Sequence, residues 1–198
     1  MKIKVIGLCG GSGSGKGVVS AFFSEFGYLT VDTDKVYRNI TDTKSPCLDA
    51  LIVEFGSKIL NENGTLDRRV LAGMVFADSV KLNKLNLITH KFVLDEVRRM
   101  IREAEKVGYA GVVVDAPLLY ESGFDKECDL VIAVIADKKL RIKRIIERDK
   151  ITETEAIRRI DSQKSDDELK VLSDFFIDNN GDTAALRVEL MKLLEKIK

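Results

Sequence analysis

The fold of this chain is decided by Val5-Ile6-Gly7-Leu8-Cys9-Gly10-Gly11-Ser12-Gly13-Ser14-Gly15-Lys16-Gly17-Val18-Val19. The order of residue types predicts a buried strand, a glycine-rich loop and the first turn of a helix. The loop matches the phosphate-loop pattern Gly-x4-Gly-Lys at Gly10, Gly15 and Lys16. Glycine is needed because successive backbone N–H groups must converge on phosphate oxygens, with positive φ angles and no Cβ in the way. The lysine and the flanking strand and helix argue against the alternative, a glycine-rich turn that binds nothing.

The predicted site is an anion-binding cradle made of main-chain amides. The helix that begins near Gly15 contributes unsatisfied N–H groups and the positive end of its dipole, and Lys16 adds a mobile charge for the β- and γ-phosphates. The residues expected to bind the nucleotide are Gly11, Ser12, Gly13, Ser14, Gly15, Lys16, Gly17 and Val18.

The residue after Lys16 departs from the phosphate-loop pattern. Ser or Thr is expected there because its hydroxyl ligates Mg²⁺, but this chain has Gly17 followed by Val18. The next hydroxyl, that of Ser20, lies one turn further along the predicted helix and should point elsewhere. The sequence thus predicts a phosphate site in which the usual metal ligand is absent.

Composition limits the class of protein. At 198 residues with 45% hydrophobic content, the chain is long enough for one α/β domain with helical insertions. Lys plus Arg and Asp plus Glu each total 32, so no net charge draws the whole molecule to nucleic acid or membrane. No apolar run approaches the roughly 18 residues of a transmembrane helix or forms a signal peptide. We therefore expect a soluble cytoplasmic protein that binds neither nucleic acid nor membrane.

Cysteine usage predicts neither a disulfide framework nor a zinc site. Cys9, Cys47 and Cys128 are scattered along the chain and lack Cys-x-x-Cys spacing. We expect them to be small buried side chains.

Two carboxylates follow the strand predicted at residues 28–31. Asp32 and Asp34 come at its carboxyl end, where open α/β sheets bind their ligands. Each has two interpretations: it acts on a ligand beside the phosphates, or it caps a helix that starts at about Lys35, since Asp is a favoured N-cap residue. The position favours function for Asp34 and does not decide for Asp32.

Residues 35–106 predict a helical subdomain. The segment is charged, contains the turn signals Pro46 and Asn61-Glu62-Asn63-Gly64, and is too long to connect adjacent strands. We expect it to lie over the crevice of the sheet. Arg69, in an Arg-Arg pair, either binds an anionic substrate or is solvated, and His90 is either a structural histidine or a site residue.

The second half of the chain supplies the remaining strands. Residues 111–115 predict a central strand buried on both faces, since they show no polar alternation. Asp115 ends this strand where a Walker-B carboxylate would hold Mg²⁺ through water. Further strands are predicted at residues 129–135 and 175–177.

A long basic helix follows residues 129–135. Arg141, Arg144 and Arg148 are spaced by three and four residues and so fall on one face. Near a polyphosphate this face is a candidate lid that stabilises the transferring charge, and the alternative is a solvated helix surface. The next helix begins with a capping box and carries Gln163.

These pieces occur in one order that resembles the dephospho-CoA kinase family over the whole chain. Many nucleotide-binding proteins share the glycine loop, but the Pro-Leu-Leu-aromatic-Glu segment combined with the late Arg-Ile-x-x-Gln and Ile-x-Asn pieces is far more specific. The matching pieces are Gly7 to Lys16, Asp32-Thr33-Asp34, Gly64-Thr65-Leu66-Asp67-Arg68-Arg69, Leu85-Asn86-Leu87-Ile88-Thr89-His90, Pro117-Leu118-Leu119-Tyr120-Glu121, Arg144 with Arg148-Asp149, Arg159-Ile160-x-x-Gln163 and Ile177-Asp178-Asn179-Asn180-Gly181.

The resemblance implies a fold and a reaction. The fold is an α/β P-loop NTPase of three αβα layers with a five-stranded parallel sheet, plus a helical substrate-binding subdomain and a helical lid. The core would comprise residues 1–34 and 110–198, the subdomain residues 35–106 and the lid residues 140–165. The reaction is transfer of the γ-phosphoryl group of ATP to the ribose 3′-hydroxyl of dephospho-CoA, with Mg²⁺ assisting. We expect a monomer or small homo-oligomer.

The resemblance also implies roles for single residues. Asp34 matches the general base, and Lys16, Arg144 and Arg148 complete the expected catalytic set. Arg69 and His90 match positions on the acceptor side. The other expected contacts are Pro117, Leu118 and Glu121 with the substrate, Asn179 near the adenine of ATP, and Asp115 with Mg²⁺ through water.

Three departures from the family's pattern are present. Gly17 and Val18 replace Ser-Thr, Lys91 stands where Pro is usual, and Arg141 replaces a common Gln. We expect the last two on a helix surface, whereas the first would weaken Mg²⁺ binding. Two alternatives therefore stay open: another small-molecule or nucleotide kinase on this scaffold, and a non-catalytic ATP-binding protein.

Overall fold

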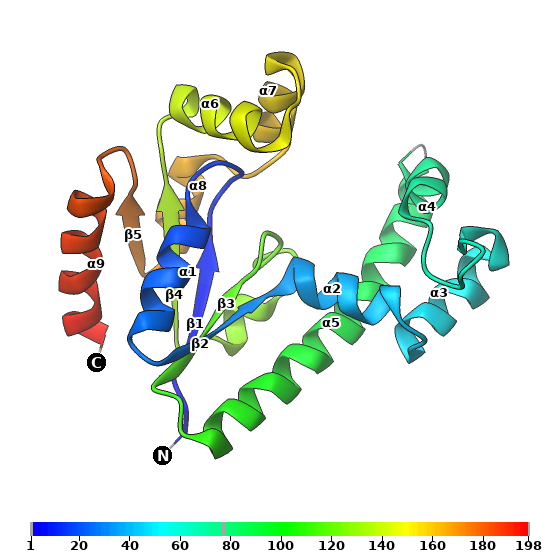
Figure 1. The fold of residues 1–198 in the computed structure, drawn as a ribbon, viewed down its shortest axis with the longest axis horizontal. Coiled ribbons are helices and arrows are strands. Elements are labelled where there is room, and N and C mark those ends of the chain that lie inside the picture. Colours follow the sequence, from blue (N-terminus) through cyan, green and yellow to red (C-terminus); the bar gives the residue numbers. More distant parts are fainter. Residues whose placement is uncertain (1, 77, 198) are drawn as a thin grey trace. The chain divides into compact units, whose positions relative to one another are not determined.

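The computed structural model describes residues 2–76 and 78–197. Its centre is a five-stranded parallel sheet with the strand order β2-β3-β1-β4-β5 (Figure 1). The strands are β1 (Val5–Cys9), β2 (Tyr28–Asp32), β3 (Gly111–Asp115), β4 (Leu130–Ile135) and β5 (Phe175–Asp178). Each lies where the sequence predicts a strand, and the P-loop NTPase fold class is confirmed.

The strand order places the loop after β1 at the middle of the sheet. β1 pairs with β3 on one side and with β4 on the other. Every residue of β1 is buried. A strand covered on both faces needs an apolar run and not alternation, which explains its sequence.

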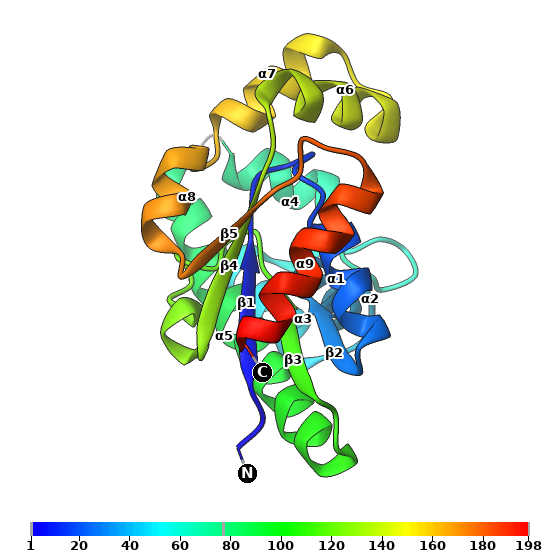
Figure 2. The same ribbon diagram turned by 90° about the vertical axis from the view of Figure 1, so that its left-hand side faces the viewer.

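Two helices cover one face of this sheet, α1 (Lys16–Glu25) and α9 (Thr183–Ile197) (Figure 2). Phe22 and Phe23 of α1 and Leu190 and Leu194 of α9 belong to one buried core with strand residues such as Ile132. This packing fixes where α1 starts and therefore where its N-terminal amides lie.

Further helical segments follow β3 and β4 along the chain. They include η2 (Phe124–Glu127), α6 (Lys138–Asp149), α7 (Glu153–Asp161) and α8 (Asp166–Leu172). The predicted capping box is present: the side chain of Thr152 accepts from the N–H of Glu155, whose carboxylate accepts from the N–H of Thr152. The prediction that this helix carries Gln163 is wrong, because α7 ends at Asp161.

Contacts divide the described chain into two compact units, one of which is Asp32–Arg102. It contains α2 (Thr33–Asp42), α3 (Pro46–Phe55), η1 (Ser57–Ile59), α4 (Arg68–Val75) and most of α5 (Ser79–Val107). A core of its own, built around Leu51, Phe55 and Ile59, holds these helices together. The segment is therefore helical, as its pattern indicates, and has a hydrophobic core of its own.

None of the helices that the structure describes has the length and apolar character needed to cross a membrane. All three cysteines are free, Cys9 and Cys47 being buried and Cys128 half-buried. The expected burial is therefore found for Cys9 and Cys47 and only in part for Cys128.

Candidate active site

The loop between β1 and α1 has the backbone of an anion-binding site. Gly15 is the N-cap of α1 with a φ of 99°, in the left-handed region that favours glycine. A Cβ there would also lie 2.0 Å from Nδ2 of Asn179. Lys16 and Gly17 are the first residues of α1, so their N–H groups belong to the helix end that lacks backbone acceptors. The loop therefore presents main-chain amides to an anion.

The ammonium group of Lys16 lies between this loop and the end of β3. Its Nζ donates to the carbonyl oxygen of Gly10 at 2.9 Å and lies 3.8 Å from Oδ1 of Asp115. The Lys16 and Asp115 side chains are only 14% and 19% exposed, so water screens their attraction weakly. Sheet register explains the pairing, because Leu8 near the end of β1 is the partner of Asp115.

Asp115 is the described carboxylate beside Lys16 that could face a bound Mg²⁺. Asp115 ends β3 beside Lys16, and position 17 has no side-chain oxygen. Within residues 2–76 and 78–197, no group of three or more His, Cys, Asp or Glu side chains could hold a metal ion. Mg²⁺ commonly takes one or two protein carboxylates and completes its coordination with water and substrate phosphates. The donor set thus fits an ion that arrives with a nucleotide.

Two arginines of α6 hold the loop from one side. Nε of Arg141 donates to the carbonyl oxygen of Ser12 at 2.9 Å. Arg144 donates to the carbonyl oxygens of Gly13 and Asn179 at 3.2 and 3.1 Å. The expectation that Arg141 lies on a helix surface is wrong: only 3% of it is exposed, because it is packed against the loop.

Arg148, the third arginine of the predicted face, belongs to a surface network. Its Nε and Nη2 donate to the carboxylate of Asp149 at 2.7 and 2.9 Å, and Arg159 donates to the same carboxylate. The hydrogen bonds from Arg148 and Arg159 lower the pKa of Asp149 to about 2. Helical spacing placed three arginines on one face of the helix, and only two of them, Arg141 and Arg144, contact the loop.

Two amide side chains complete the surroundings of the loop. Oε1 of Gln163 accepts from the N–H of Ser12 at 2.8 Å, and its Nε2 donates to Oγ of Ser12 at 3.2 Å. Asn179 is buried and donates from Nδ2 to the carbonyl oxygen of Ser14 at 2.7 Å. The sequence did not single out Gln163 as a site residue, although the Arg-Ile-x-x-Gln piece was a signal that could have identified it.

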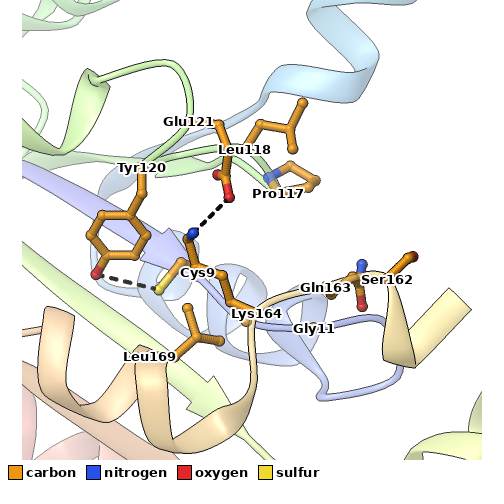
Figure 3. A pocket seen from close by; sticks show the side chains of 11 residues that line it. Cys9, Gly11, Pro117, Leu118, Tyr120, Glu121, Ser162, Gln163, Lys164 and Leu169 are labelled. Carbon is orange, nitrogen blue, oxygen red and sulfur yellow. Dashed lines mark hydrogen bonds and ion pairs between the residues drawn. The ribbon is translucent and has the colours of Figure 1, made fainter. Parts of the chain in front are cut away.

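A pocket opens beside the start of the loop (Figure 3). Its lining includes Pro117, Leu118 and Glu121, the segment that the sequence assigns to the substrate. The carboxylate of Glu121 lies 3.1 Å from Nζ of Lys164. A cavity of about 110 Å³ has room for several water molecules or a polar group of a ligand. The other lining residues are Cys9, Gly10, Gly11, Tyr120, Ser162, Gln163 and Leu169.

Cys9 in this pocket is not built as a nucleophile. Burial raises the pKa of its thiol. Its Sγ lies 3.6 Å from Oγ of Ser173 and 4.0 Å from Oη of Tyr120. A buried, protonated thiol is unreactive at neutral pH, so the pocket is suited to binding and not to covalent chemistry.

In the unit Asp32–Arg102, the carboxylate that ends β2 and the one two residues later have different places. Asp32 is the N-cap of α2, and its Oδ1 accepts from the N–H of Lys35 at 3.1 Å. The capping interpretation is therefore confirmed for Asp32, although the helix begins at Thr33 and not near Lys35. Asp34, the second residue of α2, is exposed and is not the cap.

The other predicted residues of this unit are Arg69 and His90. Neighbouring Arg68 donates to the carboxylate of Asp42 at 2.7 Å and to Oγ1 of Thr41 at 2.8 Å, which gives it a structural role. Arg69 is exposed in the first turn of α4 and accessible to an anion. His90 is half-buried in α5.

Comparison with known proteins identifies close relatives. A family model described as dephospho-CoA kinase matches residues 4–185. The dephospho-CoA kinase of Corynebacterium glutamicum is 42% identical over 192 residues, covering 97% of this chain and 96% of the relative. That of Fusobacterium nucleatum is 39% identical over 198 residues, covering 100% of both chains. The solved dephospho-CoA kinase from Campylobacter jejuni aligns with a TM-score of 0.71 and 27% identity, covering 98% of this chain and 96% of that one.

Proposed function

The chain belongs to the dephospho-CoA kinase family, and from this we propose that it transfers the γ-phosphoryl group of ATP to the ribose 3′-hydroxyl of dephospho-CoA, giving CoA and ADP. The observation that carries the proposal is a phosphate loop inside a family match that spans residues 4–185. The alternative, a kinase for a different acceptor, would require that such a kinase also match the dephospho-CoA kinase model over residues 4–185. The non-catalytic alternative rests on Gly17 alone.

We assign nucleotide binding to the loop and its supports. Phosphoryl transfer requires alignment and stabilisation of charge on the phosphate oxygens, which amides and cations supply. The main-chain N–H groups at the start of α1, those of Lys16 and Gly17, and the ammonium of Lys16 would hold the β- and γ-phosphates. Arg144, beside the loop, and Arg148 would add positive charge from α6, and Asn179 would line the nucleotide side.

We assign the acceptor to Asp34 and the residues expected around it. Asp34 would orient the acceptor hydroxyl and accept its proton, because an exposed carboxylate following a strand of the sheet is suited to that task. Arg69 and His90 would contact the anionic and hydrogen-bonding groups of dephospho-CoA. Pro117, Leu118 and Glu121 would bind the same substrate in the pocket beside the loop.

Asp115 is the residue proposed to hold Mg²⁺, through water. When bound with the nucleotide, Mg²⁺ neutralises charge on the β- and γ-phosphate oxygens. Asp115 also fixes the position of Lys16, 3.8 Å away. Its carboxylate therefore serves the ammonium and, with nucleotide present, the metal.

Replacing Gly17 with serine is expected to lower the Mg²⁺ requirement. A Cβ at position 17 meets no atom within 4 Å, so the side chain fits, and its hydroxyl would supply the usual ligand. The Mg²⁺ concentration that gives half-maximal activity should fall by up to about tenfold, the smaller of the effects on metal affinity seen when groups around a metal are changed. The Mg²⁺ concentration that gives half of the increase in ATP affinity, measured by calorimetry, should fall by the same factor. Gly17→Ala fills the space without an oxygen and is the control. Equal behaviour of the two variants would contradict the expectation.

The function itself is tested by ADP release in a coupled assay. Dephospho-CoA should support turnover, with CoA identified by mass, whereas shikimate and nucleoside monophosphates should not. Turnover with one of those acceptors in place of dephospho-CoA would favour another kinase. ATP binding without transfer to any acceptor at high Mg²⁺ would favour the non-catalytic alternative.

A further inference from the structure

The peptide groups on both sides of Ser12 are held by side chains from outside the loop. Its carbonyl oxygen accepts from Nε of Arg141 at 2.9 Å, and its N–H donates to Oε1 of Gln163 at 2.8 Å. Gln163 also donates to Oγ of Ser12 at 3.2 Å. The three bonds reach across more than 120 residues of sequence, from α6 and from the turn after α7.

Arg141 is itself fixed in place. Its side chain is 4% exposed, and Nη1 lies 3.0 Å from Oδ1 of Asp166 at the start of α8. Its Nη2 donates to Oε1 of Gln163 at 3.5 Å. A buried cation is tolerated only when it is paired and hydrogen-bonded, and Asp166, Gln163 and Ser12 meet that requirement. Arg141, Gln163 and Asp166, which we call the Ser12 clamp, therefore form one connected network.

The glycines of the loop fit this clamp. A Cβ at Gly11 would lie 1.9 Å from Nη2 of Arg141, and one at Gly13 would lie 2.6 Å from its carbonyl oxygen. The loop therefore lies against the guanidinium of Arg141 at Gly11 and against the backbone of Arg141 at Gly13. Any side chain at either position would displace Arg141 or the loop.

A glycine-rich loop needs such support. Glycine loses more conformational freedom on ordering than any other residue, so a loose loop would lose that entropy whenever it bound phosphate. A loop held beforehand in its binding shape binds more tightly, because the loss has already occurred on folding. The clamp touches backbone on both sides of Ser12 and leaves the amides at the start of α1 to the ligand.

We propose that Arg141 and Gln163 are positioning residues that hold the phosphate loop in its nucleotide-binding shape before ATP arrives. The proposal rests on the proposed function in that the loop binds ATP. It differs from the lid role expected for the α6 arginines, because Arg141 acts through the loop backbone and not on the transferred phosphate. Position 141, where Arg replaces the Gln that is common in the family, therefore has a definite role in this chain.

Arg141→Met and Gln163→Leu test the proposal. Each should raise the dissociation constant for ADP, measured by calorimetry, by about tenfold to a hundredfold, as expected for the loss of hydrogen bonds that involve a charged group or leave a donor unpaired. For Arg141→Met, which changes a side chain outside the pocket lined by Pro117, Leu118 and Glu121, KM for dephospho-CoA should stay unchanged. The control is Lys143→Met, which removes a positive charge from the same helix at a side chain that is 72% exposed and paired with Glu147.

The double variant adds a readout that loss of stability alone would not produce. Because both side chains hold one peptide segment, Arg141→Met with Gln163→Leu should weaken ADP binding by less than the product of the single effects. A lower melting temperature with unchanged ADP affinity would overturn the proposal. If Arg141→Met does not fold, Gln163→Leu decides, since it leaves the Arg141–Asp166 pair in place. A wild-type chain that bound ADP but did not phosphorylate dephospho-CoA would contradict the function and leave this comparison valid.

Discussion

Asp34→Asn is expected to lower kcat by roughly a hundredfold to ten-thousandfold, the usual contribution of a positioned general base. Asparagine has the same size and can still accept a hydrogen bond, but it cannot take the proton of the acceptor hydroxyl. ADP binding should be retained, because the phosphate loop belongs to a different part of the chain. Steady-state turnover and calorimetric ADP binding on the same preparation separate the two effects.

Asp32 provides the matched control for this variant. It is the N-cap of α2, and asparagine caps a helix about as well as aspartate. Asp32→Asn therefore removes the same charge two residues away while keeping α2 intact, and it should retain most of the activity. Near-normal turnover of Asp34→Asn, or an equal loss in Asp32→Asn, would show that Asp34 is not the base.

The strands and the loop were predictable because their signals are local. A strand buried on both faces is a short apolar run, and a phosphate loop is a fixed spacing of glycines and one lysine. β1 therefore lies in the apolar run before the loop, and α1 begins at Lys16, as the sequence indicates. The position of Asp115 was predictable for the same reason. It ends the apolar run of residues 111–115, and this run forms the strand that pairs with β1.

The supports of the loop were not predictable in this way. Helical period shows that Arg141 and Arg144 share a face, but not what covers that face, and the partner of Arg141 lies 129 residues away. Gln163 was missed for the same reason, because it contacts Ser12, which is distant in sequence. In addition, it lies after the end of α7 and not within the helix, so helical spacing does not locate it. Asp32 could be assigned only when the start of α2 was known, since a cap and a ligand-binding carboxylate look alike in sequence.

Lys16→Met is expected to lower kcat by about a hundredfold to a thousandfold, the range for removing one donor aimed at charge that develops in a transition state. Methionine keeps the unbranched stem, so the packing of a side chain that is only 14% exposed is preserved while its charge is lost. The phosphate oxygens would then lose the one cation that the loop itself contributes. Affinity for ATP should fall as well, and turnover measured at saturating ATP isolates the effect on the chemical step.

A second variant, at the neighbouring carboxylate of Asp115, tests this prediction further. With the ammonium gone, Asp115 Oδ1 no longer has a positive charge 3.8 Å away, and its own charge then opposes the bound phosphates. Asp115→Asn combined with Lys16→Met should therefore bind ADP more tightly in the absence of Mg²⁺ than Lys16→Met alone, while kcat stays low. If the single variant kept kcat within threefold of the wild type, or if the double variant restored turnover, Lys16 would serve only to neutralise Asp115. In the proposed mechanism, the charge of Lys16 acts instead on the transferring phosphoryl group.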